Sequence, residues 1–170
     1  VIGYRAASYS ITNRSLWALD ILNEAGFKYD SSIFPVYHDR YGIADARQEP
    51  HVMTCNNGGN LVEFPLSVYE LFKYKLPVSG GGYFRLYPYR FTKWALKSLN
   101  NDEKGFVFYL HPWEVDPNQP KIKTNFLSRF RHYNNLDICK NRLEKLITDF
   151  DFTTMRDVLA GKKLLDYNND

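Results

Sequence analysis

The alternation of apolar and polar residues predicts short strands in this chain. A run at 106–111 predicts a buried strand that ends at about His111, because Pro112 cannot donate a hydrogen bond to a sheet. A histidine is therefore expected at a strand exit, with Trp113 and Glu114 just beyond it. Shorter runs with the β-branched and aromatic content of strands occur at 1–4, 27–29 and 61–64.

Other segments have the apolar spacing of helices. The first of these can be capped by Thr12 or Asn13 and ended by Gly26. It lies between two of the expected strands, and a strand, a helix and a second strand in this order are typical of a parallel α/β unit. The predicted fold class is therefore α/β. Further helices are predicted at 88–99, 136–150 and 154–159.

Three segments are predicted to be irregular, at 33–60, 79–85 and 114–128. The long first loop contains a charged and aromatic stretch, which favours a functional role. The second contains three consecutive glycines. It is either a binding loop that presents Tyr83 and Arg85 or a flexible turn. It is not a phosphate-binding loop, because the Gly-Lys-Ser/Thr ending of that motif is absent.

Length and composition fit one globular domain, expected at 1–160 with a polar tail at 161–170. The chain has 170 residues and a net charge of +3, and its Lys and Arg residues are scattered, which argues against a nucleic-acid partner. No apolar run is long enough to suggest a membrane span. Cys55 and Cys139 have no metal-ligand spacing. The aromatic content of 16% suits sugar or protein partners, although many rings will be core.

Arg5, Asp30 and His111 fall at three predicted strand exits, where α/β sheets usually hold reacting groups. A carboxylate beside a histidine raises the pKa of the imidazole and orients it, which suits a general acid. An arginine nearby can hold a second carboxylate. Each residue taken singly could instead have a surface or capping role, and His111 could be a core histidine bonded to a carbonyl.

Several motifs of the chain resemble those of the polysaccharide deacetylases of carbohydrate esterase family 4. The stretches 3–8, 26–32 and 110–114 look like the third, fourth and fifth motifs of that family. The match is closer still to a subgroup associated with exosortase and exopolysaccharide loci, whose C-terminal extension resembles 38–42, 80–85 and 129–133. The resemblance covers nearly the whole chain, to about Leu159.

The resemblance implies the C-terminal portion of a distorted (β/α) barrel with a helical extension, and a metal-dependent removal of N-acetyl groups from an exopolysaccharide or its precursor. His111 would protonate the leaving amine, Asp30 would pair with His111, and Arg5 would hold a catalytic aspartate. An acetylated polysaccharide is the implied partner, in a bacterial cytoplasm or cell envelope. The residues expected to bind substrate are Tyr83, Phe84, Arg85, Leu110, Trp113, His38, Arg40 and Tyr133.

The sequence also departs from the family pattern. Ala7 stands where the third motif usually has proline, and Phe34 stands where many relatives have tryptophan. The first two motifs, which supply the base and the ligands of a divalent metal such as zinc, are not found, and the four histidines include no pair with the required spacing. We therefore expect a part of a deacetylase that is inactive alone and could associate through an open barrel edge.

Two other functions fit the same residues. A non-catalytic glycan-binding module would stack sugars on Tyr83, Trp113 and Tyr133, with His111 only a hydrogen-bond donor. An interaction surface for a biosynthetic complex would instead bind protein partners and have no affinity for sugar.

Overall fold

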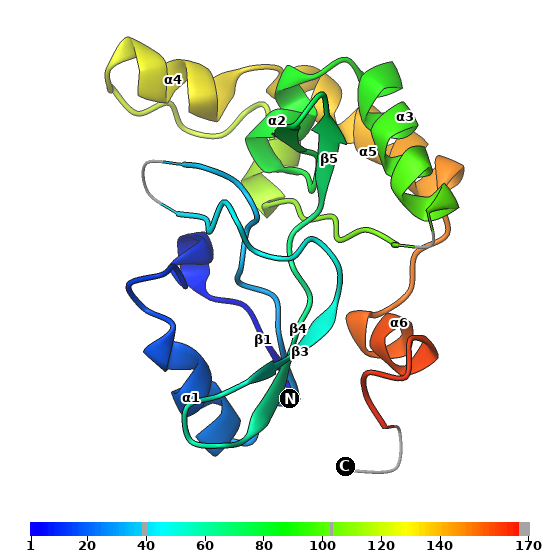
Figure 1. Cartoon of the computed structure of the whole chain (residues 1–170). Helices are drawn as coiled ribbons and strands as arrows, with labels where there is room; N and C mark the ends of the chain where they lie inside the picture. The colour runs from blue at the N-terminus through cyan, green and yellow to red at the C-terminus, as the bar shows by residue number, and fades with distance from the viewer. Residues whose placement is uncertain (39–40, 103, 167–170) are drawn as a thin grey trace. The chain divides into compact units, whose positions relative to one another are not determined.

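The chain folds into two compact units, shown in Figure 1. The computed structural model describes residues 1–38, 41–102 and 104–166. The first unit consists of Val1–Leu76 together with Thr153–Asp170, and the second of Pro77–Phe152. A mixed α/β structure is confirmed. No closed barrel is formed by the described residues, and the predicted barrel portion stays a prediction.

The first unit is built on a four-stranded sheet with the order β1-β2-β4-β3. The strands β1, β2 and β4 are parallel, and β3 runs antiparallel to β4. The expected strands at the front of the chain and before Pro65 are thus confirmed, and β3 was missed inside the predicted long loop. The strand bounds are Gly3–Tyr4 (β1), Tyr29–Asp30 (β2), His51–Thr54 (β3) and Asn60–Glu63 (β4).

A helix connects the first two parallel strands, as predicted. The 3-10 turn η1 (Ala7–Tyr9) follows β1, and α1 (Trp17–Glu24) begins later than the expected caps, because residues 12–15 form a separate turn. Leu19 and Leu22 of α1 are buried in the core of this unit. That core consists of Ala6, Ile11, Leu19, Leu22, Ile33, Ile43, Cys55 and Leu61.

A hairpin and a terminal helix complete the first unit. The strands β5 (Val68–Leu71) and β6 (Tyr74–Pro77) pair as a two-stranded sheet. Their turn residues Phe72 and Lys73 have φ angles of 46° and 70°. This turn type is usually made by Asn or Gly, and neither residue is present here, so the hairpin could not be predicted from its turn. The predicted last helix is present as α6 (Met155–Gly161), capped by Thr154, whose Oγ1 accepts a hydrogen bond from Asp157 N.

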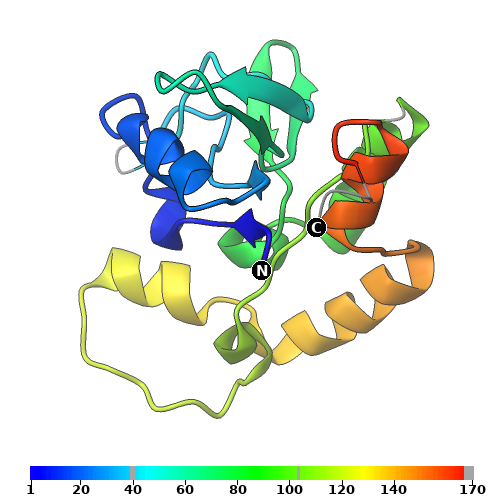
Figure 2. The ribbon, with the colours of Figure 1, turned by 90° about the horizontal axis from the view of Figure 1, so that it is seen from below.

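The second unit is mostly helical. Helix α5 contacts α2, α3 and the short 3-10 helix η2. Figure 2 shows the connection from η2 to α4 as a long loop without regular structure. The helices predicted from Pro88 and over 136–150 are confirmed. The bounds are Gly81–Leu86 (α2), Tyr89–Asn101 (α3), Pro112–Val115 (η2), Phe126–Tyr133 (α4) and Leu136–Asp149 (α5).

Two predictions for this unit were wrong. The glycine-rich stretch 79–85 was predicted to be irregular, but most of it forms the helix α2. Gly80 and Gly81 adopt φ angles of 118° and 58° at the start of this helix, and Phe84 is buried. The run 106–111 is not a regular strand, since it pairs only through one parallel bridge between Gly80 and Tyr109. Its aromatic pattern reflects side-chain packing instead. Within the described residues, no helix has the length and apolarity that a bilayer crossing requires.

Candidate functional site

Three charged side chains lie at neighbouring strand exits in the first unit. Arg5 follows β1 directly, Asp30 is the last residue of β2, and Glu63 is the last residue of β4. The strand register pairs Tyr4 with Asp30 and Asp30 with Glu63. Since the three strands are parallel, the charged groups share one edge of the sheet. The sequence predicted the first two of these positions, and Glu63 was missed.

The guanidinium of Arg5 is hydrogen-bonded to the residue that follows β2. Its Nε donates to Ser31 O and its Nη2 donates to Ser31 Oγ, both at 2.8 Å. Ser31 Oγ in turn donates to Phe64 O at 2.6 Å, just beyond β4. The guanidinium therefore joins the exits of all three parallel strands through one serine.

Asp30 is fully buried, with 0% of its surface exposed. Its Oδ2 accepts the Ser32 N–H at 3.0 Å, and its Oδ1 accepts the Ser32 hydroxyl at 2.7 Å. Ser32 Oγ also accepts the Ala6 N–H at 2.7 Å. Burial raises the pKa of Asp30, and the hydrogen bonds from Glu63 and Ser32 partly offset that rise. Asp30 is thus held in one orientation by the loop that follows it.

Glu63 is buried next to Asp30, with 1% of its surface exposed. Its Oε1 accepts the Ile33 N–H at 3.0 Å. Burial and the neighbouring Asp30 charge raise the pKa of Glu63 well above its usual value, and Arg5 lowers it only in part. Burial therefore favours the neutral form of Glu63 next to Asp30.

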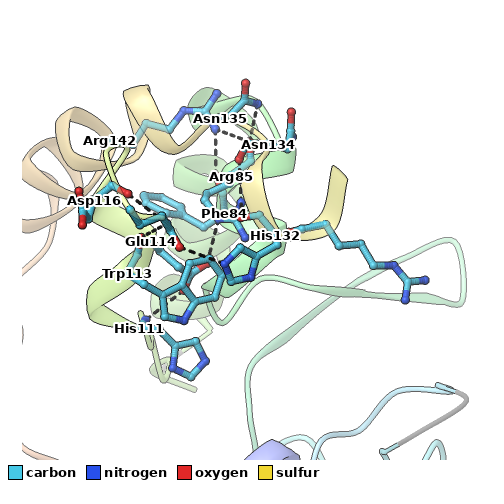
Figure 3. Close-up of polar contacts among 12 residues, drawn as sticks. Phe84, Arg85, His111, Trp113, Glu114, Asp116, His132, Asn134, Asn135 and Arg142 are labelled. Carbon is cyan, nitrogen blue, oxygen red and sulfur yellow. Dashed lines mark hydrogen bonds and ion pairs between the residues drawn. The ribbon is translucent and has the colours of Figure 1, made fainter. Parts of the chain in front are cut away.

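The second unit contains a different buried cluster, centred on Arg85 of α2 (Figure 3). Arg85 is 1% exposed, and its Nε forms a 2.9 Å ion pair with Glu114 Oε1. Its remaining nitrogens donate to backbone carbonyls at the end of α4, namely those of Arg131, His132 and Asn134. The guanidinium thus connects α2, η2 and α4. Its predicted contact with substrate is untested, but in this arrangement its donors are used internally.

Glu114 fixes the backbone at His111. Its Oε2 accepts the His111 N–H at 3.0 Å, and the Glu114 N–H donates to His111 O at 2.9 Å. Because Glu114 is held by Arg85, the histidine is anchored to a buried ion pair. His111 itself is exposed. Its backbone position is therefore determined by the interior, while its ring reaches the surface of the unit.

Aromatic rings surround His111 on the same unit. The rings of His111 and Trp113 are nearly parallel with centroids 5.8 Å apart, and the rings of Trp113 and His132 are stacked at 4.1 Å. The Arg85 guanidinium carbon lies 5.2 Å from the centroid of Trp113. Figure 3 shows both imidazoles next to the indole. Trp113 is thus engaged with side chains of its own unit, and we name His111, Trp113 and His132 the imidazole–indole stack.

The remaining substrate-binding predictions fall in varied surroundings. Tyr83 is half-buried with its ring 5.9 Å from that of Tyr87. Phe84 is buried, with its ring edge-on to Phe108 at 4.9 Å. The Tyr133 hydroxyl accepts the Ile122 N–H at 2.9 Å. Leu110 is half-buried.

In the first unit, the predicted binding residue His38 is half-buried and stacks on Tyr41, with ring centroids 3.8 Å apart. Tyr41 also stacks on Phe34, at 5.8 Å. Arg40, also predicted to bind substrate, lies outside the described residues.

Arg5 and Asp30 belong to the first unit and His111 to the second. The predicted pairing of Asp30 with His111 therefore stays a prediction. In the described ranges, no three His, Cys, Asp or Glu side chains come together as metal ligands. Glu63 and Glu114 are central to the two buried clusters, although the sequence analysis assigned neither of them to the site.

A family model described as "Domain of unknown function (DUF3473)" matches residues 31–160. The chain belongs to that family. The matched region contains Glu63, Arg85, His111 and Glu114, whereas Asp30 lies directly before it and Arg5 lies further toward the N-terminus. No curated protein and no solved structure matches the chain.

Proposed function

We propose that this chain is part of a metal-dependent polysaccharide deacetylase, which removes N-acetyl groups from an exopolysaccharide or its precursor. The observation that supports the proposal most is the strand register, which pairs Tyr4 with Asp30, so that Arg5, the residue after Tyr4, lies at the same carboxyl edge of the parallel sheet as Asp30. These are the positions of the third and fourth deacetylase motifs that the chain resembles. The family to which the chain belongs is associated with polysaccharide deacetylase-like proteins.

Under this proposal, three residues have separate roles in the deacetylation. His111, on its anchored backbone, donates a proton to the amine that leaves when the amide bond breaks. Asp30 accepts the other ring N–H of that histidine and orients it. Arg5 holds the catalytic aspartate by a bidentate pair. The hydrogen bonds of Arg5 to Ser31 and of Asp30 to Ser32 support these roles, because they fix both side chains before substrate binds.

A divalent metal in such an enzyme polarises the amide carbonyl and a water molecule. The described residues do not fit it, since no three ligand-type side chains converge. Under this proposal, the metal would be held by ligands other than the described residues.

The test is acetate release from an N-acetylated oligosaccharide by the product of the complete reading frame that contains these residues. We expect His111→Ala to lower kcat by about 100-fold or more, the usual contribution of a general acid. His51→Ala is the matched control, because His51 lies on β3 with its ring bonded to Glu49 O, and we expect unchanged activity. Equal activity of wild type and His111→Ala would contradict the assignment.

A glycan-binding module is the second candidate, and a row of rings in the second unit favours it. Tyr83, Tyr87, Phe91 and Trp94 form successive ring contacts at 5.9, 5.2 and 5.8 Å. Trp94 is 49% exposed and could carry a sugar ring. This candidate predicts that the 170-residue chain binds an N-acetylated oligosaccharide, that Trp94→Ala weakens binding, and that His111→Ala does not.

A further inference from the structure

The exits of β2 and β4 place two acidic side chains next to each other in the interior of the first unit. Asp30 and Glu63 are register partners, and both are buried. With both carboxyl groups ionised, Glu63 Oε2 has no hydrogen-bond partner among the described residues. An unpartnered carboxylate oxygen in the interior is costly, so the geometry calls for a proton at this position.

The surrounding charges lead to the same conclusion. Arg5 is the cation that acts on Glu63, and its Nε and Nη2 are already hydrogen-bonded to Ser31. Two adjacent buried carboxylates without a dedicated cation cannot both stay ionised. The hydrogen bonds from Ser32 favour the ionised form of Asp30, whereas Glu63 accepts a single backbone N–H. Of the two groups, Glu63 is therefore the one that retains the proton.

We propose that Glu63 is a positioning residue that keeps its proton and donates a hydrogen bond to Asp30, so that the buried pair carries one negative charge. Glu63 Oε2, which otherwise has no partner among the described residues, then carries the proton and donates to Asp30, and Asp30 stays ionised in a fixed orientation. The use of that carboxylate to orient a catalytic histidine rests on the proposed function. The sharing of the proton does not depend on it.

The proposal predicts how stability changes with pH. Burial and Asp30 raise the pKa of Glu63 in the folded chain well above its value in the unfolded chain. Above the unfolded value, the unfolded chain has lost a proton that the folded chain still holds. Stability therefore falls as pH rises through this window, by up to about tenfold in the folding equilibrium constant per pH unit for one proton. Glutamine has the shape of glutamic acid and does not titrate, so Glu63→Gln should remove this dependence of stability on pH.

The first experiment is carbon-13 NMR titration of the side-chain carboxyl groups in the full 170-residue chain. The signals of Asp30 and Glu63 are assigned in the wild-type chain through the scalar couplings along each side chain. We expect Glu63 to titrate well above the exposed glutamates, and to titrate lower in Asp30→Asn. A Glu63 signal that titrates with the exposed glutamates, or that does not move in Asp30→Asn, overturns the proposal.

The second experiment measures Tm against pH for Glu63→Gln. The amide oxygen can accept the Ile33 N–H, and the amide NH₂ can donate to Asp30. We expect the Tm of this variant to rise relative to wild type as pH increases from acidic to neutral. Glu24→Gln, at an exposed site on α1, is the control and should show a constant difference. A constant difference for Glu63→Gln would contradict proton sharing.

Both experiments are independent of the proposed activity. The wild-type titration needs no variant to fold, so it decides the position of the Glu63 proton even if Glu63→Gln is unstable. Failure of acetate release with a high-titrating Glu63 would count against the deacetylase proposal alone. Normal titration of Glu63 in an active deacetylase would count against the positioning role alone.

Discussion

The two units bury a glutamate in opposite ways. Glu114 is paired with the Arg85 guanidinium, and both of its oxygens have hydrogen-bond partners. Glu63 lies beside a second acid, and one of its oxygens has no partner unless it is protonated. A buried carboxyl group can be neutralised by a cation or by a proton, and the choice decides whether its contribution depends on pH.

The difference also separates two roles. The Arg85–Glu114 pair connects three helices and anchors the backbone of His111, so it builds the second unit. The Asp30–Glu63 pair adds a destabilising burial that the first unit could avoid with apolar residues. Destabilised, closely spaced acids are typical of functional positions. The comparison therefore supports the proposed functional role of the sheet edge, whereas the Arg85 cluster has a structural role.

The largest expected change in the free energy of unfolding follows from removing Glu114, the glutamate that is paired with a cation. Glu114→Ala leaves the Arg85 charge buried and the His111 N–H without its acceptor, which should destabilise the chain by about 3–5 kcal/mol. Urea unfolding at neutral pH measures this change. Lys93→Met is the control, because it removes the exposed ion pair with Asp149 and should have little effect. Similar losses in the two variants would break the proposed contrast.

The sequence predicted the sheet edge better than the interior. Arg5 and Asp30 stand out because each follows or ends a predicted strand and is followed by small residues. Glu63 was missed because it lies within the run 61–64, which was interpreted only as a strand. A carboxyl residue inside an otherwise apolar strand was the available signal, since a buried charge needs a partner or a proton.

The helical unit shows why the rest could not be predicted. The glycines at the start of α2 favoured a loop, whereas in the structure Phe84 and Arg85 of this segment are buried, with α2 against α5 and Arg85 paired with Glu114 of η2. Tertiary contacts of this kind override local propensity. Glu114 likewise looked like one of two carboxylates in a loop, because its partner Arg85 is 29 residues away in sequence.

The next effect concerns the hydrogen bonds that favour the ionised form of Asp30. Ser32→Ala removes the hydroxyl that donates to Asp30 and leaves the Ala6 N–H without an acceptor, at a cost of about 1–3 kcal/mol. Removal of a donor should raise the pKa of Asp30 further. The loss in Tm should therefore be smaller at acidic pH and grow as pH rises through the titration of Asp30.

Thermal unfolding of Ser32→Ala across this pH range tests that expectation. Asn135→Ala is the comparison in the second unit, because Asn135 Nδ2 donates to the uncharged Arg85 carbonyl at 2.8 Å. Its loss in Tm should not depend on pH in the same range. A Ser32→Ala difference that is equally flat would indicate that Asp30 is not ionised in the folded chain.

The smallest expected effect is in the imidazole–indole stack. Trp113→Leu keeps an apolar side chain on η2 but removes the rings that contact His111 and His132, together with the Arg85 cation–π contact. We expect a loss of about 1–2 kcal/mol, since one aromatic pair and one cation–π contact disappear. Because Glu114 still fixes the His111 backbone, the ring of His111 should gain fast motion while its backbone does not.

Nuclear relaxation of the His111 ring and backbone measures both quantities in one sample. In Glu114→Gln the order should reverse, with the backbone of His111 released first, because the amide can keep only one of the two roles of the carboxylate. If Trp113→Leu mobilises the His111 backbone as well, the buried ion pair is not what anchors this histidine. The second unit would then hold His111 through ring stacking, and the contrast between the buried acids Glu114 and Glu63 would no longer explain how this histidine is positioned.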